Sequence, residues 1–160
     1  MPATRRDIES HMTIIKNILV PTDFSEQAEA AVRVAADLAR AHHAGVTLLH
    51  VHETTTYELP EGYVQNMTSE LDRAHAQFNL RLEESERVLR TLDVQRVEKR
   101  ILNGTIVDEI VKFSSDFDYL VIGTHGRTPL QRLFLGSVAQ KVLERASCMV
   151  VVVRAAQPPS

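Results

Sequence analysis

The chain has 160 residues, a length typical of one compact domain with a single core. Hydrophobic residues make up 44% of it and charged residues 24%, which leaves little room for a long disordered region. The formal net charge of -3 argues against a general nucleic-acid-binding protein, because such proteins carry a basic excess that neutralises phosphates.

The cysteine content and the hydropathy indicate in which cellular compartment the protein is expected. Cys148 is the only cysteine, so neither a disulfide within the chain nor a zinc site built from thiolates can form. No apolar run approaches the roughly 20 residues that span a bilayer, and the first residues lack the apolar centre of a signal peptide. We therefore expect a cytoplasmic protein that does not bind membranes.

The ends of the chain differ from its middle. Residues 1–11 show no hydrophobic periodicity, and we expect residues 1–12 to be a flexible arm, a remnant of cloning or the product of an upstream start. The folded domain is expected over residues 13–154, followed by a short tail at residues 155–160.

Between these ends, short apolar runs alternate with amphipathic segments. The first helix is expected to start at an N-cap, Ser25, and to end at His42, with Gly45 in the position of a C-terminal cap glycine. Two of the other helices are expected over 71–92 and 138–146. A short helix is expected to begin after Thr105, which has the spacing of a capping box with Asp108. The runs expected to be strands are 14–20, 46–51, 97–102, 119–122 and 149–153.

Strands this apolar, separated by helices, are typical of a parallel sheet that is covered on both faces and joined by right-handed crossovers. We therefore predict an α/β protein with a single doubly wound five-stranded sheet. Residues 97–102 are more polar than the other runs and are expected at a sheet edge. Ligands of such sheets bind at the carboxyl ends of the strands where the winding reverses, which directs attention to the loops after 14–20, 46–51 and 119–122.

The most informative motif is Gly123-Thr124-His125-Gly126, followed after nine residues by Gly136-Ser137. Glycines let backbone N–H groups approach phosphate oxygens, and the helix that follows supplies unpaired donors at its N-terminus. Ser137 adds a hydroxyl, and Arg127 and Arg132 add positive charge. The motif indicates a polyphosphate site, with an ordinary loop that ends in an N-cap serine as the alternative.

Other phosphate chemistry fits less well. No G-x-x-x-x-G-K-[ST] run occurs and the turn at 21–25 has no glycine, so Walker-type hydrolysis and dinucleotide binding are disfavoured. A phospho-acceptor receiver domain would need an aspartate where Asn103-Gly104 stands. No serine, cysteine or lysine has an identifiable base and orienting partner, so any turnover is expected to be slow.

Three segments, in order along this strand pattern, resemble the universal stress protein family. They are Ile-Leu-Val-Pro-Thr-Asp-Phe-Ser at 18–25, Leu-Leu-His-Val at 48–51, and the glycine-rich motif from Gly123 to Ser137. The resemblance runs from about Thr13 to Arg154. It implies a fold like that of the adenine nucleotide alpha hydrolases, with strands ordered 3-2-1-4-5 and ATP across the switch between the first and fourth strands.

The resemblance also implies which residues meet the nucleotide. The side chain of Asp23 would lie beside the nucleoside, the backbone of Val51 would meet the adenine edge, and the glycine-rich loop would hold ribose and phosphates. Mg²⁺ or Mn²⁺ would arrive with the triphosphate. The residues expected to bind ATP are Pro21, Thr22, Asp23, Val51, Gly123, Thr124, His125, Gly126, Arg127, Gly136, Ser137 and Val138.

The sequence departs from the family at two positions. Pro129 stands where the family commonly has glycine, which stiffens the middle of the phosphate loop and removes one N–H donor. Met149 stands where proline is common, which restores a donor at the start of the last strand. The first change affects the phosphate end of the expected site more than the adenine end.

Several of these features have a second interpretation. Asp23 is either a nucleotide contact or a turn residue ahead of the first helix. His50, His52 and Glu53 either form a metal cluster or are a strand end that emerges into solvent. Cys148 fits a small buried residue better than a reactive thiol, because no base is visible beside it.

Taken with the resemblance, the motif favours an ATP-binding regulatory protein of the stress response. The alternatives are a slow ATP hydrolase or nucleotidyl-transfer enzyme that uses the same pocket, and an interaction module whose pocket stays empty. Residues 149–153 form an apolar strand that the topology and the resemblance place at a sheet edge. In the family this strand pairs with its copy, so we expect a homodimer.

Overall fold

The computed structural model of the chain describes residues 14–53, 64–124 and 135–155. The expected N-terminal arm and the middle of the glycine-rich loop, including His125, Gly126, Arg127, Pro129 and Arg132, lie outside the described residues. In chain order the elements are β1 (Asn17–Pro21), α2 (Glu26–His42), β2 (Gly45–His52), α3 (Val64–Thr91), β3 (Val97–Asn103), α4 (Ile106–Ser114), β4 (Tyr119–Gly123), α5 (Ser137–Arg145) and β5 (Met149–Val153).

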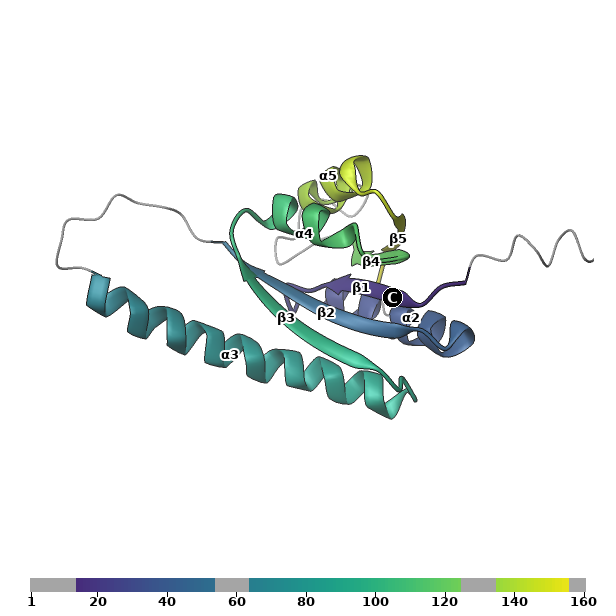
Figure 1. Cartoon of the computed structure of the whole chain (residues 1–160), viewed down its shortest axis with the longest axis horizontal. Helices are drawn as coiled ribbons and strands as arrows, with labels where there is room; N and C mark the ends of the chain where they lie inside the picture. The colour runs from purple at the N-terminus through teal and green to yellow at the C-terminus, as the bar shows by residue number, and fades with distance from the viewer. Residues whose placement is uncertain (1–13, 54–63, 125–134, 156–160) are drawn as a thin grey trace, which may run out of the picture.

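The five strands form one parallel sheet ordered β3-β2-β1-β4-β5. Helices α2 and α3 cover one face of this sheet, and α4 and α5 cover the other (Figure 1). The predicted fold class and strand order are confirmed. Because β1 pairs with β2 on one side and β4 on the other, the winding reverses between β1 and β4.

Two cores hold the layers together, one on each face of the sheet. Side chains of β1 alternate between them, with Ile18 and Val20 facing α2 and α3 while Leu19 faces α4 and α5. All three are fully buried, as the continuous apolar run predicts for a central strand. Each such side chain contributes about 1.5–3 kcal/mol relative to an exposed position.

The two edges of the sheet differ in character. Strand β3 confirms the predicted polar edge: Glu98 and Arg100 are exposed and pair at 2.8 Å, while Lys99 binds Glu86 of α3 at 2.8 Å. Strand β5 is the opposite edge and carries no charge.

Besides the start of α3, which lies at Val64 and not at residue 71, three local predictions were wrong. Strand β1 begins at Asn17 and not at Ile14, because the N–H groups of Lys16 and Asn17 donate to the carboxylate of Asp118 at 2.8 and 2.9 Å. The capping box at Thr105 is absent, since that residue caps α4 without a side-chain hydrogen bond.

The third error is the C-terminal cap of α2. Gly45 was expected to take the left-handed position, but His43 takes it, with a φ of 56° and an N–H that donates to the carbonyl of Ala39. Histidine tolerates this conformation better than most residues do. Gly45 is therefore free to begin β2, where its N–H donates to the carbonyl of Lys16 at 2.8 Å.

Candidate functional site

A cavity of about 610 Å³ lies at the carboxyl ends of β1, β2 and β4, where the winding of the sheet reverses. The first turns of α4 and α5 close its far side, through Ile106 and Ser137. The structure brings together all of the predicted ATP-binding residues that it describes, as lining of this cavity: Pro21, Thr22, Asp23, Val51, Gly123, Thr124, Gly136, Ser137 and Val138.

The turn after β1 carries Asp23 into this cavity through a ladder of short hydrogen bonds. The N–H of Thr22 donates to the carbonyl of Leu49 at 2.8 Å, and the Thr22 hydroxyl accepts the N–H of Phe24 at 3.0 Å. One carboxylate oxygen of Asp23 accepts the N–H of Ser25 at 3.0 Å. Ser25 in turn caps α2, as predicted. Asp23 is therefore a turn residue, and it also lines the cavity.

The end of β2 forms the adjoining wall. Val51 packs with the apolar side chains beneath α4 and α5, whereas the His50 side chain lies on the other face of the sheet. The His50 ring lies 4.7 Å from that of Phe24 and 4.2 Å from that of Phe78, and its Nδ1 is 2.8 Å from the carbonyl oxygen of Thr22. His50 thus links β2 to the Asp23 turn.

The alternative of a metal cluster at this strand end is not supported. His52 packs its ring against Phe78 at 5.2 Å and meets His75 edge-on at 6.2 Å. Over residues 14–53, 64–124 and 135–155, no three His, Cys, Asp or Glu side chains gather closely enough to hold a metal ion. The aromatic packing accounts for the histidines.

On the β4 side, the two ends of the glycine-rich loop meet. The N–H of Gly136 donates to the carbonyl of Thr124 at 2.6 Å, and the N–H of Thr124 donates to the carbonyl of Val153 at 2.8 Å. Gly136 is also the N-cap residue of α5, so Ser137 is the first helical residue and not the cap. As a glycine, Gly136 gives α5 no capping side chain, and it lines the cavity together with Ser137 and Val138. A ligand in the cavity can therefore reach the N-terminus of α5.

Gly123 is required for the close packing of β4 against α2. A Cβ at Gly123 would lie 2.8 Å from the backbone carbon and oxygen of Gln27, which is closer than packed atoms allow. Gln27 also holds the chain beyond β5, because its side-chain oxygen accepts the N–H of Ala155 at 2.7 Å. The hydroxyl of Thr124 is 3.5 Å from the same oxygen.

Sequence reasoning missed part of the cavity wall. Phe78 of α3 lines it, although its helical spacing indicated only a buried face. Apolar side chains of α4 and β4 complete the wall: Ile106, Ile110 and Ile122. The only available signal was that each belongs to the apolar side of an element adjoining a predicted strand end.

Cys148 is not among the residues that line this cavity; it is partly buried and packs against the core beneath α4 and α5. Burial raises the pKa of its thiol, which opposes formation of the reactive thiolate. Cys148 is less buried than expected from the sequence, and its interpretation as a packing residue stays a prediction.

The fold and the cavity define a doubly wound α/β protein with a cavity of about 610 Å³ at its switch point. The family model for the universal stress protein family matches residues 15–154. The chain belongs to this family, and the resemblance seen in the sequence is confirmed.

Individual relatives agree. A universal stress protein of Methanocaldococcus jannaschii is 31% identical over 150 residues, which cover 92% of this chain and 86% of the relative. The solved structure of the universal stress protein UspA from Lactobacillus plantarum has a TM-score of 0.79 and 27% identity, over 89% of this chain and 99% of that one. A universal stress protein in complex with cAMP shares the fold, with a TM-score of 0.68, 24% identity, and coverage of 89% and 98%.

Among the helices in the described parts of the chain, none has the length and apolarity that crossing a bilayer requires.

Proposed function

We propose that this chain is an ATP-binding regulatory protein of the stress response and that the cavity at the switch point is its ATP site. The observation that carries the proposal is the meeting, in one cavity, of an apolar wall, a carboxylate and the N-terminus of α5, whose N-cap residue is a glycine. A volume of about 610 Å³ lies within the range of small-molecule sites.

The three parts of ATP have different partners in this proposal. The adenine ring packs on the apolar wall that includes Ile110 and Ile122 and meets the backbone of Val51. The carboxylate of Asp23 accepts hydrogen bonds from the ribose hydroxyls, which are donors of the kind a carboxylate binds. The N–H groups at the start of α5 bind phosphate oxygens, with Gly126 and Arg127 of the same loop as further expected contacts.

A divalent cation, Mg²⁺ or Mn²⁺, would be bound through the phosphates. The described residues supply no cage of acidic side chains, and these cations are commonly held by substrate phosphates together with one or two carboxylates. The complex of a related fold with cAMP supports an adenine nucleotide as the ligand class. A cytoplasmic location, expected from the sequence, is part of the same proposal.

Calorimetric titration with ATP, adenosine and GTP tests this proposal. We expect one saturable site per chain for ATP, weaker binding of adenosine, which lacks the phosphates, and weaker binding of GTP, whose base edge has the opposite donor pattern. Absence of saturable binding of any of the three would contradict the proposed function.

The alternative function is a slow hydrolase or a nucleotidyl-transfer enzyme that uses the same pocket. A regulatory protein and such an enzyme differ in how fast they turn over ATP. Product release from radiolabelled ATP under single-turnover conditions separates them. A regulatory protein retains intact ATP over many minutes, whereas an enzyme releases phosphate or pyrophosphate at a rate that rises with Mg²⁺.

We also propose that the chain forms a homodimer through β5. This strand is a sheet edge without charge or proline; Met149 is 49% exposed, and Val150, Val151 and Val152 are only partly buried. Antiparallel pairing with its copy would satisfy the free edge across a two-fold axis.

Sedimentation velocity at micromolar concentration tests the dimer. We expect a dimer for the native chain and dissociation for Val151→Asp, because the substitution places two like charges near the axis. A native chain that remains monomeric would refute pairing through this edge.

A further inference from the structure

The turn that carries Asp23 contains an unusual backbone conformation. Phe24 has a φ of 64°, in the left-handed region that bulky residues rarely adopt. Such a conformation persists only where surrounding contacts impose it, and it is common at ligand-binding turns. The residue lies between Asp23, which lines the cavity, and Ser25, which caps α2. Phe24 thus separates Asp23 from Ser25, whose N–H the Asp23 carboxylate accepts at 3.0 Å.

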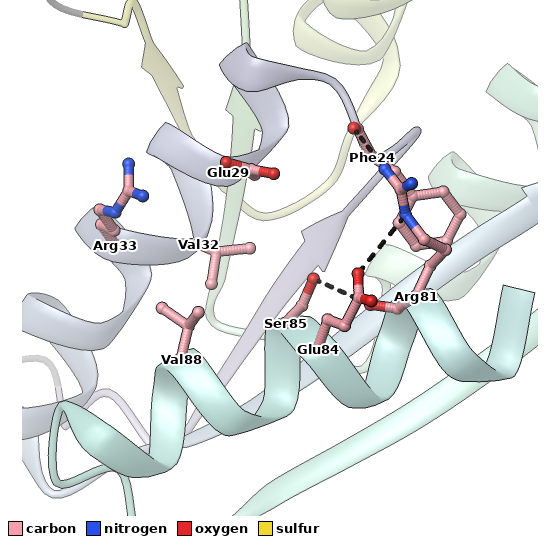
Figure 2. Close-up of a pocket in the computed structure, with 8 residues that line it drawn as sticks. All are labelled: Phe24, Glu29, Val32, Arg33, Arg81, Glu84, Ser85 and Val88. Atoms are coloured by element: carbon pink, nitrogen blue, oxygen red, sulfur yellow. Dashed lines mark hydrogen bonds and ion pairs between the residues drawn. The ribbon is translucent and has the colours of Figure 1, made fainter.

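One side chain from a distant element contacts Phe24 in two ways. Arg81 of α3 places its guanidinium carbon 5.4 Å from the centre of the Phe24 ring, and its Nη2 donates to the Phe24 carbonyl oxygen at 3.3 Å (Figure 2). Glu84, one helical turn further along, pairs with the Nε of Arg81 at 3.7 Å and helps to orient it. A change of Phe24 to a negative φ would move both the ring and the adjoining peptide group away from Arg81.

The inner side of the same turn is held as well. The Phe24 ring lies against His50, whose Nδ1 is 2.8 Å from the carbonyl oxygen of Thr22. Phe24 is thus held between β2 on the cavity side and Arg81 on the outer side. Arg81 does not line the cavity itself, so any effect it has on a ligand must pass through the turn.

We propose that Arg81 is a positioning residue for nucleoside recognition. By holding Phe24 in its left-handed conformation, Arg81 fixes the carboxylate of Asp23 at the angle at which it accepts the ribose hydroxyls. The proposal rests on the proposed function, in which Asp23 contacts the nucleoside. It gives α3 a second role in binding, beside that of Phe78, which lines the cavity.

A matched control is available in the same groove. Arg33 of α2 lines, with Arg81, a small groove of about 110 Å³ between α2 and α3, and its guanidinium lies well apart from the Phe24 ring (Figure 2). Replacement of either arginine by methionine removes one positive charge and retains a long apolar stem. A difference between the two variants therefore reports on the contact with Phe24 and not on net charge.

Titration calorimetry with adenosine and with ATP tests the proposal. Arg81→Met should weaken both ligands to a similar extent, by about five- to twentyfold, the scale of a lost cation–π contact and a lost charged hydrogen bond. Arg33→Met should leave both affinities within about twofold, because an exposed charge acts weakly over such a distance.

A double-substitution cycle distinguishes positioning from a general structural effect. If Arg81 acts through Asp23, Arg81→Met should have almost no further effect in a chain that already carries Asp23→Ala. If its effect adds in full to that of Asp23→Ala, or if Arg81→Met leaves affinity unchanged, the proposal is wrong.

Three further outcomes are distinguishable. Should Arg81→Met fail to fold, Arg81→Lys provides the test: its compact ammonium cannot both cover the ring and reach the carbonyl, so affinity should fall while the melting temperature is retained. Should the native chain bind neither ligand, the proposed function and this inference fail together. Should Asp23→Ala bind normally while Arg81→Met binds weakly, this inference is wrong and so is the contact of Asp23 with the ribose, whereas the cavity remains the proposed ATP site.

Discussion

Two aspartates at opposite ends of the sheet use the same chemistry for different purposes. At the amino ends of the strands, the carboxylate of Asp118 accepts the N–H groups of Lys16 and Asn17 at 2.8 and 2.9 Å. At the carboxyl ends, the carboxylate of Asp23 accepts the N–H of Ser25 at 3.0 Å and also lines the large cavity. Each aspartate satisfies backbone donors, but only Asp23 is also aimed at a space for a ligand.

The difference follows from the surroundings of each end. At the amino ends, backbone groups bind one another across the gaps between strands: the carbonyl of Lys16 accepts the N–H of Gly45, and the carbonyl of Asn17 accepts that of Asp118. At the carboxyl ends, the reversal of winding between β1 and β4 separates the crossovers and leaves the cavity. We call the amino ends of the strands, near Asp118, the closed end of the sheet, and the carboxyl ends, near Asp23, the open end. Substitutions at the closed end should affect stability. Substitutions at the open end should affect binding, unless they also disturb the packing of strands and helices.

The largest expected effect is a loss of stability on substitution of Gly123, a residue at the open end that packs against the backbone of α2. Gly123→Val should lower the free energy of unfolding by about 3 kcal/mol or more, because its Cβ would lie 2.8 Å from the backbone of Gln27. Thermal denaturation followed by circular dichroism measures this loss. A variant as stable as the native chain would mean that β4 and α2 can separate at no cost.

Gly136 should behave in the opposite way. Its φ of -63° is one that any residue adopts, so Gly136→Val should fold, yet its side chain would occupy space where α5 meets the phosphates. We expect ATP affinity to fall by about a hundredfold or more, the scale of a filled phosphate site. Gly126→Val, in the same loop, should act similarly. If calorimetry finds both variants unchanged, the glycine-rich loop does not bind the phosphates.

Asp23→Ala should have an intermediate effect on binding, together with a small loss of stability because the N–H of Ser25 loses its acceptor. We expect adenosine and ATP to lose affinity by similar factors, about tenfold, because the lost contact is with the nucleoside. Arg127→Ala should show the reverse pattern, with a larger loss for ATP than for adenosine. An effect of Asp23→Ala that is confined to ATP would place this carboxylate at the phosphates.

Asp118→Asn should have the smallest effect, and one that depends on pH. Backbone N–H groups, first that of Lys16 and then that of Asn17, lower the pKa of Asp118. Its carboxylate therefore stabilises the fold above the usual pKa of about 3.9, and this stabilisation is lost as pH falls through the lowered value.

Because Asp118 is partly exposed, we expect a loss of at most about 1 kcal/mol at pH 7. Urea denaturation of the native chain and Asp118→Asn at pH 7 and at pH 3 measures it. The difference between the two proteins should shrink at the lower pH, and ATP affinity at pH 7 should be equal. A difference that grows on acidification would contradict this role.

Sequence reasoning predicted the alternation of strands and helices, because buried parallel strands such as 46–51 and amphipathic helices have distinct periodicities. It did not predict the order of the strands from periodicity, since an apolar run does not identify its neighbours. The order came from the family resemblance. Gly123 and Gly136 were found because their motif follows a predicted strand and leads into a predicted helix, whereas Asp23 was assigned to the site through the resemblance.

The residues that were missed depend on contacts between distant parts of the chain. Phe78 and Arg81 look like ordinary positions on a long helix, and only the packing of α3 against the end of β2 brings them to Phe24. The left-handed conformation of Phe24 is imposed by those same contacts, so no local preference indicates it. His43 replaced Gly45 at the end of α2 because the next strand begins at once.

Backbone amide shifts in two-dimensional NMR spectra, recorded while ATP is added, test the central claim most directly. The account predicts that the amides of Thr22, Asp23, Val51 and Ser137 shift and saturate together, while those of Lys16, Asn17 and Asp118 at the closed end stay in place. Shifts concentrated at the closed end, or no saturable shifts at all, would contradict the assignment of the open end as the ATP site.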